Sequence, residues 1–201
     1  MNTVHIMYNY VQQHKGFADV QTELIRKSIH VLIAFVPLLA ALIGRGPALA
    51  LLAGGVVFYT YAEIQRTNGR SIPFITGITC AAARREDLSG KIILGPITLG
   101  IGAMTALIMY PQTASIVAIY ALAFGDSVSS IIGKAVGRIH LGRLGRKTLE
   151  GSLACFFTVF FISFRMSSSL SGSCLIALTA TLLEAVPVRD LDNIVMPMGS
   201  G

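Results

Sequence analysis

The sequence contains no tryptophan and carries little charge for its length. Only 13% of its 201 residues are Asp, Glu, Lys or Arg, whereas soluble domains carry roughly 25%. Hydrophobic residues make up 53% of the chain, and the mean hydropathy is +0.68. This shortage of charge excludes an ordinary soluble domain and predicts a membrane protein of one compact domain.

Cysteine and acidic residues are also few. The three cysteines, Cys80, Cys155 and Cys174, show no metal-ligand spacing, so we expect reduced packing residues. Sixteen basic residues outnumber ten acidic ones, which gives a net charge of +6. Such a charge could attract nucleic acid, but there is no soluble basic domain to hold it. We therefore expect no nucleic-acid partner.

Long apolar runs are present instead. Crossing about 30 Å of hydrocarbon takes about 20 apolar residues. Six segments meet or approach this length: 28–44, 47–64, 92–110, 113–133, 152–168 and 170–187. A further run at 72–83 is too short to cross and is expected at the interface, as a re-entrant segment or packed on the bundle. The sequence thus predicts an all-α polytopic membrane protein with about six transmembrane helices, the third kinked at Gly95-Pro96.

The distribution of positive charge predicts the orientation. With both termini in the cytoplasm, 14 of the 16 Lys and Arg residues lie inside, so the inverted topology is untenable. We expect a cytoplasmic segment at 1–27, a transmembrane catalytic domain at 28–197 and a tail at 198–201. The N-terminus does not resemble a cleaved signal peptide, so the first hydrophobic helix would act as the membrane signal. In a bacterium this would be the plasma or inner membrane, and an oligomer is possible.

Asp126 is the most informative single residue, because it lies in an otherwise uncharged apolar stretch. A carboxylate in a membrane helix is costly and usually pairs with a cation or lines a polar cavity. Gly133 and Gly137 follow at i+7 and i+11, on the same side of a helix. These glycines either let two helices pack closely or let the backbone approach an anion.

A basic, glycine-containing loop follows this helix and ends in the sequence Lys147-Thr148-Leu149-Glu150-Gly151-Ser152. Five cations lie between residues 134 and 151, and cations neutralise phosphate. The start of the next helix adds free N–H groups and a positive dipole end, which favour anions. The loop is not a Walker A motif. Together with Asp126 it predicts a metal–nucleotide site at the mouth of a helical bundle.

Two further clusters flank this region. Glu23, Arg26, Lys27 and His30 follow a spacing of i, i+3, i+4 and i+7, which places them on one helical face. Glu23 paired with Arg26 or Lys27 would make an ordinary membrane anchor, but an anchor leaves the deeper His30 unexplained. Near the other end, Asp192 and Asn193 either cap a helix or supply oxygen ligands to Mg²⁺.

These residues resemble the membrane-bound CTP-dependent lipid kinases, namely dolichol, polyprenol, phytol and diacylglycerol kinases. That group shares a signature with CTP:phosphatidate cytidylyltransferases. The resemblance covers about residues 23–197 and is carried by Glu23-x-x-Arg26-Lys27-x-x-His30, Arg84-x-Glu86, Gly125-Asp126, Gly133, Gly137-Arg138, Lys147-Thr148-x-Glu150-Gly151-Ser152 and Asp192-Asn193-x-x-x-Pro197. The first pattern is closer to the kinase branch. Family members usually continue past the last pattern into another membrane helix, whereas this sequence ends in Met-Gly-Ser-Gly.

The resemblance implies that CTP and a lipid alcohol give CDP and a lipid monophosphate, with Mg²⁺, at the cytoplasmic face. The alcohol would enter laterally from the bilayer. The implied catalytic residues are Asp126, Arg26, Lys27, His30 and Lys147. The implied metal ligands are Asp126, Glu150 and Asp192. The implied nucleotide-binding residues are Gly133, Lys134, Gly137, Arg138, Arg146, Lys147, Thr148 and Gly151.

Within this scheme, Arg26 and Lys27 would neutralise the transferring phosphoryl group, and His30 would orient the lipid hydroxyl. CTP rather than ATP follows from the resemblance alone. Two alternatives remain open at this point. A cytidylyltransferase would use the same metal and loop but release pyrophosphate. A small transporter or lipid-binding subunit would show no dependence on nucleotide.

Overall fold

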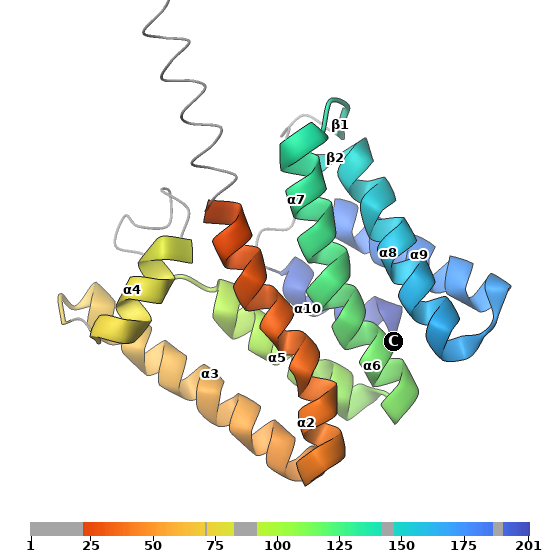
Figure 1. Cartoon of the computed structure of the whole chain (residues 1–201). Helices are drawn as coiled ribbons and strands as arrows, with labels where there is room; N and C mark the ends of the chain where they lie inside the picture. Colours follow the sequence, from red (N-terminus) through yellow and green to blue (C-terminus); the bar gives the residue numbers. More distant parts are fainter. Residues whose placement is uncertain (1–21, 71, 83–91, 142–146, 187–190) are drawn as a thin grey trace, which may run out of the picture.

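The computed structural model describes residues 22–70, 72–82, 92–141, 147–186 and 191–201. Within these ranges the chain is helical apart from turns and one short hairpin (Figure 1). The first apolar helix, Thr22–Ile43, contains a 3₁₀ segment η1 (Leu32–Phe35) and ends as α2 (Val36–Ile43). The remaining elements are α3 (Arg45–Thr67), α4 (Pro73–Ala82), α5 (Gly95–Met109), α6 (Gln112–Tyr120), the π-helical η2 (Ala121–Gly125), α7 (Asp126–Val136), β1 (His140–Leu141), β2 (Lys147–Thr148), α8 (Leu149–Ser167), α9 (Leu170–Ala185) and α10 (Asp192–Ser200).

Over their described residues, the six apolar segments expected from the sequence are largely helical, which confirms the all-α polytopic class. Within the described residues, four helices are long and apolar enough to cross a membrane: Thr22–Ile43, Arg45–Thr67, Gln112–Val136 and Leu149–Ser167. The apolar helices α5 and α9 have 15 and 16 residues. At 1.5 Å per residue they cover only about 22–24 Å. The number of spans and the orientation of the termini stay predictions.

The expected kink at Gly95-Pro96 is wrong. Helix α5 begins at Gly95, so Pro96 lies in its first turn. A proline is tolerated there because the N–H it lacks would have no partner within the helix. The short run at 72–83 forms the ten-residue helix α4, in line with its expected inability to cross.

Two domain boundaries expected from the sequence fall inside helices. The boundary at residue 27 lies within Thr22–Ile43, and α10 continues through Ser200. Residues 1–21 and the pattern Arg84-x-Glu86 lie outside the described residues.

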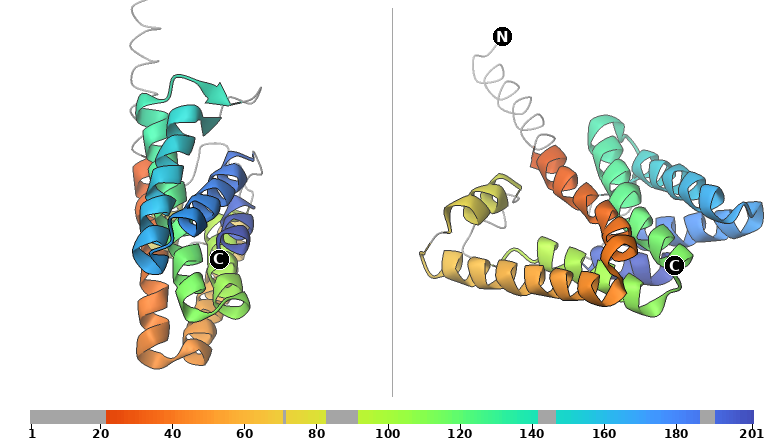
Figure 2. Two further views of the ribbon diagram at one scale, coloured as in Figure 1. Left: turned by 90° about the vertical axis from the view of Figure 1, so that its right-hand side faces the viewer. Right: turned by 60° about the horizontal axis from the view of Figure 1, so that its bottom comes forward.

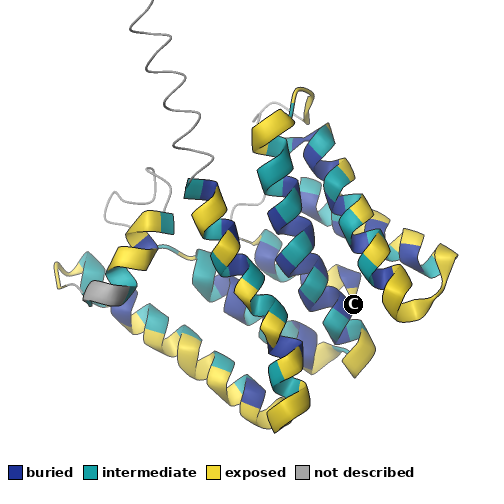
Figure 3. Ribbon diagram, viewed as in Figure 1, coloured by how far each residue is buried: buried dark blue, intermediate teal, exposed yellow. Residues whose placement is uncertain are grey.

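The helices pack around two small apolar cores. One gathers residues of α2, α5 and α6, including Val36, Leu107 and Ile119. The other joins η2, α8, α9 and α10 through residues such as Cys155 and Met196. The outer face of α3 is exposed along most of its length (Figure 3) and carries large apolar side chains such as Leu51 and Val57. In a membrane protein such a face is suited to lipid contact.

The short hairpin β1–β2 lies at the same end of the bundle as the beginning of the first helix (Figure 2). Its strands pair antiparallel, with His140 opposite Thr148. This end therefore brings together the two charged regions that the sequence singled out, although more than 100 residues separate them.

Candidate active site at the charged end of the bundle

A π-helical turn, η2, immediately precedes Asp126. A π turn inserts one residue into a regular helix and is frequent at functional sites. The turn is packed tightly, because a Cβ atom on Gly125 would lie 2.9 Å from Val159 and 3.0 Å from Met196. This packing directs Asp126 into the bundle, where only 2% of the residue is exposed.

Asp126 pairs with two groups from the first helix. Lys27 is equally buried, and its Nζ donates to Asp126 Oδ2. The Nδ1 atom of His30 lies 3.4 Å from the same oxygen. Lys27 and His30 are three residues apart and therefore share a helical face. The structure thus brings together three of the five catalytic residues expected from the sequence.

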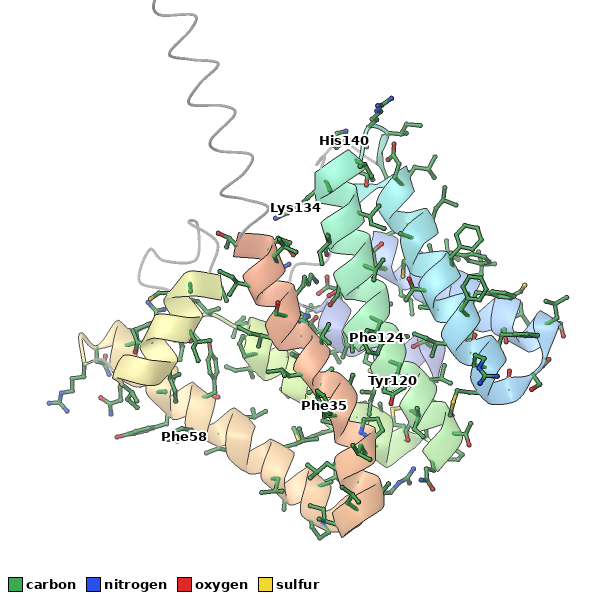
Figure 4. All side chains as sticks on the ribbon, viewed as in Figure 1. Phe35, Phe58, Tyr120, Phe124, Lys134 and His140 are labelled. Carbon is green, nitrogen blue, oxygen red and sulfur yellow. The ribbon has the colours of Figure 1, made fainter. Side chains whose placement is uncertain are left out.

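A second ion-pair cluster lies one turn nearer the helix ends. Glu23 is buried and accepts from Arg26 and from Lys134, each at 2.6 Å. The expected pairing of Glu23 with Arg26 is confirmed. Lys134 extends from α7 towards the beginning of the first helix (Figure 4), so the cluster ties these two helices together.

Glu184, near the end of α9, is a site residue that sequence reasoning missed. Its Oε1 atom accepts from Lys147 and, at 2.6 Å, from Ser129 of α7. Only 1% of Glu184 is exposed. An acidic residue in an apolar helix was the signal that could have identified Glu184. The neighbouring sequence does not predict which residues it contacts. Ser129 lies one turn from Asp126, so both carboxylates border the same region.

Lys147 is held by negative charge on several sides. Burial alone would lower the pKa of Lys147, but the carboxylates of Glu184 and Asp126 outweigh burial and raise it above its usual value. The ammonium group therefore stays positive at neutral pH. It lies between the two acids, which is a suitable place for a cation that meets phosphate.

Asp126 and Asp192 carry the oxygen donor type that Mg²⁺ prefers. Burial, and next the charge of Asp126, raise the pKa of Asp192 above its usual value. Like charges that share a site repel each other, and a cation between them relieves the repulsion. Mg²⁺ is commonly held by one or two carboxylates together with substrate phosphates.

The third expected metal ligand, Glu150, is used differently. Its carboxylate accepts the backbone N–H groups of Arg138 at 2.9 Å and Ile139 at 3.3 Å, and so holds the hairpin. Across the described ranges, no group of three or more His, Cys, Asp and Glu side chains is placed to hold a metal ion. Glu150 therefore faces the hairpin, and the metal site of three carboxylates stays a prediction.

Three glycines expected to bind nucleotide lie in the contact between α7 and α8. A Cβ atom on Gly133 would lie 2.8 Å from Thr148 Oγ1, and one on Gly137 would lie 2.6 Å from Thr148 Cγ2. A Cβ atom on Gly151 would lie 2.7 Å from the carbonyl oxygen of Ser129. Of the two roles that the sequence left open, the structure shows close helix packing.

The remaining expected nucleotide-binding residues are spread around this contact. Thr148 caps α8 by accepting the N–H of Gly151 at 3.2 Å. Arg138 is exposed beside the hairpin. Arg146 lies outside the described residues. Asn193 does not cap α10, and its Nδ2 donates to Thr98 Oγ1 of α5 at 3.0 Å.

Comparison with known proteins finds relatives of one kind. The chain is similar to "Phytol kinase 1, chloroplastic" of Arabidopsis thaliana, with 23% identity over 199 residues, 90% of this chain and 65% of that protein. It is 27% identical over 134 residues to "Probable phytol kinase, chloroplastic" of Triticum aestivum, covering 58% of this chain and 45% of that protein. The "Dolichol kinase" of Saccharomyces cerevisiae is 41% identical over 77 residues, covering 38% of this chain and 14% of that protein.

The chain thus spans less than two thirds of the length of each of these relatives. No protein-family model matches the sequence. No solved structure matches it either. The homologues are phytol kinases and a dolichol kinase, which supports a place among lipid kinases at low sequence identity.

Proposed function

We propose that the protein transfers the γ-phosphoryl group of CTP to the hydroxyl of a membrane lipid alcohol, giving CDP and a lipid monophosphate. The observation that carries this proposal is the buried charge cluster of Asp126, Lys27 and Lys147 at one end of an apolar bundle. Burying charged side chains in an apolar bundle is costly, and such residues commonly mark a functional site. The similarity to phytol and dolichol kinases supports the lipid alcohol as acceptor.

Phosphoryl transfer depends mainly on positioning and charge neutralisation. Lys27 and Lys147 each pair with a buried carboxylate. When a triphosphate enters, both ammonium groups would turn to phosphate oxygens. Arg26 and Lys134, paired with Glu23 nearby, would add positive charge at the outer side of the site.

Asp126 and Asp192 would hold Mg²⁺, which supplies charge neutralisation of the triphosphate when bound. His30, beside Asp126, would fix the direction of that carboxylate. We do not assign Glu150 to the metal, since its oxygens already accept two backbone N–H groups of the hairpin. In this arrangement the metal, the triphosphate and the cations would all meet around the first turn of α7, where Asp126 lies.

The acceptor would be a long apolar alcohol such as a prenol, phytol, dolichol or diacylglycerol. Its chain would lie along the exposed apolar faces of the helices, and only its hydroxyl would reach the charged cluster. A hydroxyl at the bilayer boundary meets a site at the end of the bundle without leaving the membrane. The active site would face the cytoplasm by the positive-inside rule.

The decisive experiment uses purified protein in detergent or vesicles, Mg²⁺, and CTP labelled on either the α or the γ phosphate. We expect the γ label, and not the α label, to enter the lipid, with ATP as a poorer donor. Resolving the products by mass identifies the alcohol. Entry of the α label would mean cytidylyl transfer and would overturn the kinase proposal. Protein that binds no nucleotide and labels no lipid would point to a transporter or binding subunit.

A further inference from the structure

Glu184 has one oxygen that its known partners do not use. Oε1 carries both donors, Ser129 and Lys147. Among the described residues, Oε2 is buried with no hydrogen-bond partner. Leaving a buried acceptor unpaired costs about 1–3 kcal/mol, and more for a charged group. A donor supplied by a ligand would remove this cost.

A second unpaired polar atom lies at the same level. The Oγ of Ser152 in α8 is also buried, and no described residue pairs with it. Helices α8 and α9 are antiparallel neighbours joined by a short turn. Ser152 in the first turn of α8 and Glu184 in the last turn of α9 are similarly far from that turn, so they lie at a similar height along the two helices.

These two atoms match the hydrogen-bonding pattern of an alcohol. A hydroxyl donates one hydrogen bond and accepts others. The carboxylate oxygen of Glu184 can only accept, whereas the Ser152 hydroxyl can donate. A phosphate oxygen would be repelled by Glu184, since both are anionic acceptors. The pair therefore favours a neutral hydroxyl over any part of the nucleotide.

We propose that Glu184 Oε2 and Ser152 Oγ bind the hydroxyl of the lipid alcohol, and that Glu184 takes its proton during transfer. This inference rests on the proposed function. The hydroxyl O–H bond breaks and its proton moves to Glu184 Oε2. The alcohol oxygen forms a bond to the γ phosphorus of the nucleoside triphosphate. The bond from that phosphorus to the β–γ bridging oxygen breaks, and the electron pair leaves with the nucleoside diphosphate.

The location suits this step. Ser129 donates to Glu184 and lies three residues after Asp126 on α7. Asp126 and Ser129 are one helical turn apart, so the hydroxyl site and the carboxylate assigned to Mg²⁺ border neighbouring turns of α7. Lys147 contacts Glu184 and lies under the influence of Asp126, so it would face the phosphoryl group from the side of the attacking oxygen.

The test compares Glu184→Gln and Ser152→Ala with Ser163→Ala in the full-length protein. Ser163 is a matched control, because it is a buried serine of α8 whose Oγ bonds Val159 O within its own helix. We expect Glu184→Gln to lower kcat by about 10²–10⁴-fold, the usual range for loss of a general base. Ser152→Ala should raise the KM for the alcohol about tenfold, as expected for one lost hydrogen bond. Ser163→Ala should change neither.

Two further readouts separate this role from a structural one. Stabilisation of Glu184→Gln by CTP and Mg²⁺ in thermal unfolding should remain as in wild type, which shows a folded nucleotide site. An alcohol acidified by fluorine next to its hydroxyl should recover part of the rate of Glu184→Gln, because it needs the base less. The same alcohol should not rescue Ser152→Ala.

The inference is overturned if Glu184→Gln keeps more than half of the wild-type kcat, or if it loses stabilisation by nucleotide along with activity. Alcohol binding is measured separately with a photoreactive long-chain alcohol, whose labelling both site variants should reduce. Wild type that binds this alcohol but phosphorylates none would refute the proposed function alone. Equal labelling of wild type and both variants would refute the hydroxyl site alone.

Discussion

Lys27 and Asp126 form an ion pair in the interior of the bundle although 99 residues separate them in sequence. Each side chain offsets part of the cost of burying the other. The pair therefore has a structural effect besides any role in catalysis, and a variant of either residue must be interpreted with its partner.

Replacing Lys27 alone should destabilise the protein. Lys27→Met leaves Asp126 as an unpaired buried charge, which costs about 3–5 kcal/mol. The double variant Lys27→Met, Asp126→Asn removes both charges and should recover most of the stability but no activity. Thermal unfolding in detergent and the γ-label assay measure the two effects. Arg165→Met, at an exposed position, is the control and should change stability by less than about 0.5 kcal/mol.

A methyl group on Gly151 should loosen the contact between α7 and α8. The new Cβ would lie 2.7 Å from the carbonyl oxygen of Ser129, a backbone atom that cannot turn away. We expect Gly151→Ala to cost about 1–3 kcal/mol. Gly54→Ala in α3 meets no atom within 4 Å and should stabilise that helix by about 0.5–1 kcal/mol. Equal stability of the two variants in thermal unfolding would contradict the packing role.

Asn193 and Thr98 should be energetically coupled. The side-chain amide of Asn193 donates to Thr98 Oγ1 across α10 and α5. A double-mutant cycle with Asn193→Ala and Thr98→Val should give a coupling of about 0.5–1.5 kcal/mol in thermal unfolding. Additive effects of the two substitutions would mean that this hydrogen bond does not hold α10.

Variants of Asp192 and Glu150 should differ in the Mg²⁺ concentration that they require. Asp126→Asn and Asp192→Asn should each raise, by tenfold or more, the Mg²⁺ concentration needed for stabilisation by CTP, because each removes one carboxylate ligand. Glu150→Gln should leave that concentration unchanged while weakening the hairpin. Chelation should abolish the stabilisation of the wild type. A Glu150→Gln variant with the Mg²⁺ requirement of Asp192→Asn would restore Glu150 to the ligand set.

The pair of Lys147 and Glu184 predicts how stability depends on pH. The pKa of Lys147 is raised on folding, with Glu184 the main cause that outweighs burial. A raised pKa contributes stability that is complete below the unfolded value, about 10.4, and is lost as the pH rises through the folded value. The difference in unfolding temperature between wild type and Lys147→Met should therefore be constant from pH 7 to about pH 9. It should shrink above about pH 10.5, and a difference that already shrinks at pH 8 would contradict the pairing.

The helices and one charged face could be predicted because their signals are local. Apolar length alone predicted all six helical segments, since a bilayer requires it. The spacing of Glu23 and Arg26 predicted their ion pair, because residues three apart meet on a helix. Asp126 was found from its burial cost in an apolar stretch. In each case the pattern lies within two or three turns of chain.

Contacts between distant segments could not be predicted. Nothing in the sequence around Glu184 indicates Ser129, which lies 55 residues earlier. Glu150 looked like a ligand because of its neighbours, but the backbone N–H groups of Arg138 and Ile139 need an acceptor where the hairpin turns. The sequence could not decide whether Gly133 serves helix packing or anion binding. The answer depends on how close Thr148 lies to Gly133, and the packing of α7 against α8 sets that distance.

The π turn at Ala121–Gly125 determines which side of the long helix Gln112–Val136 the residues after it face. Each residue of an α-helix advances by about 100° around its axis, so one inserted residue changes which side every later residue faces. The first half of Gln112–Val136 is thereby matched to its apolar neighbours, and the second half presents its acid to the first helix. The widened turn therefore lets one continuous helix direct apolar residues into the bundle in its first half and Asp126 towards the first helix in its second half.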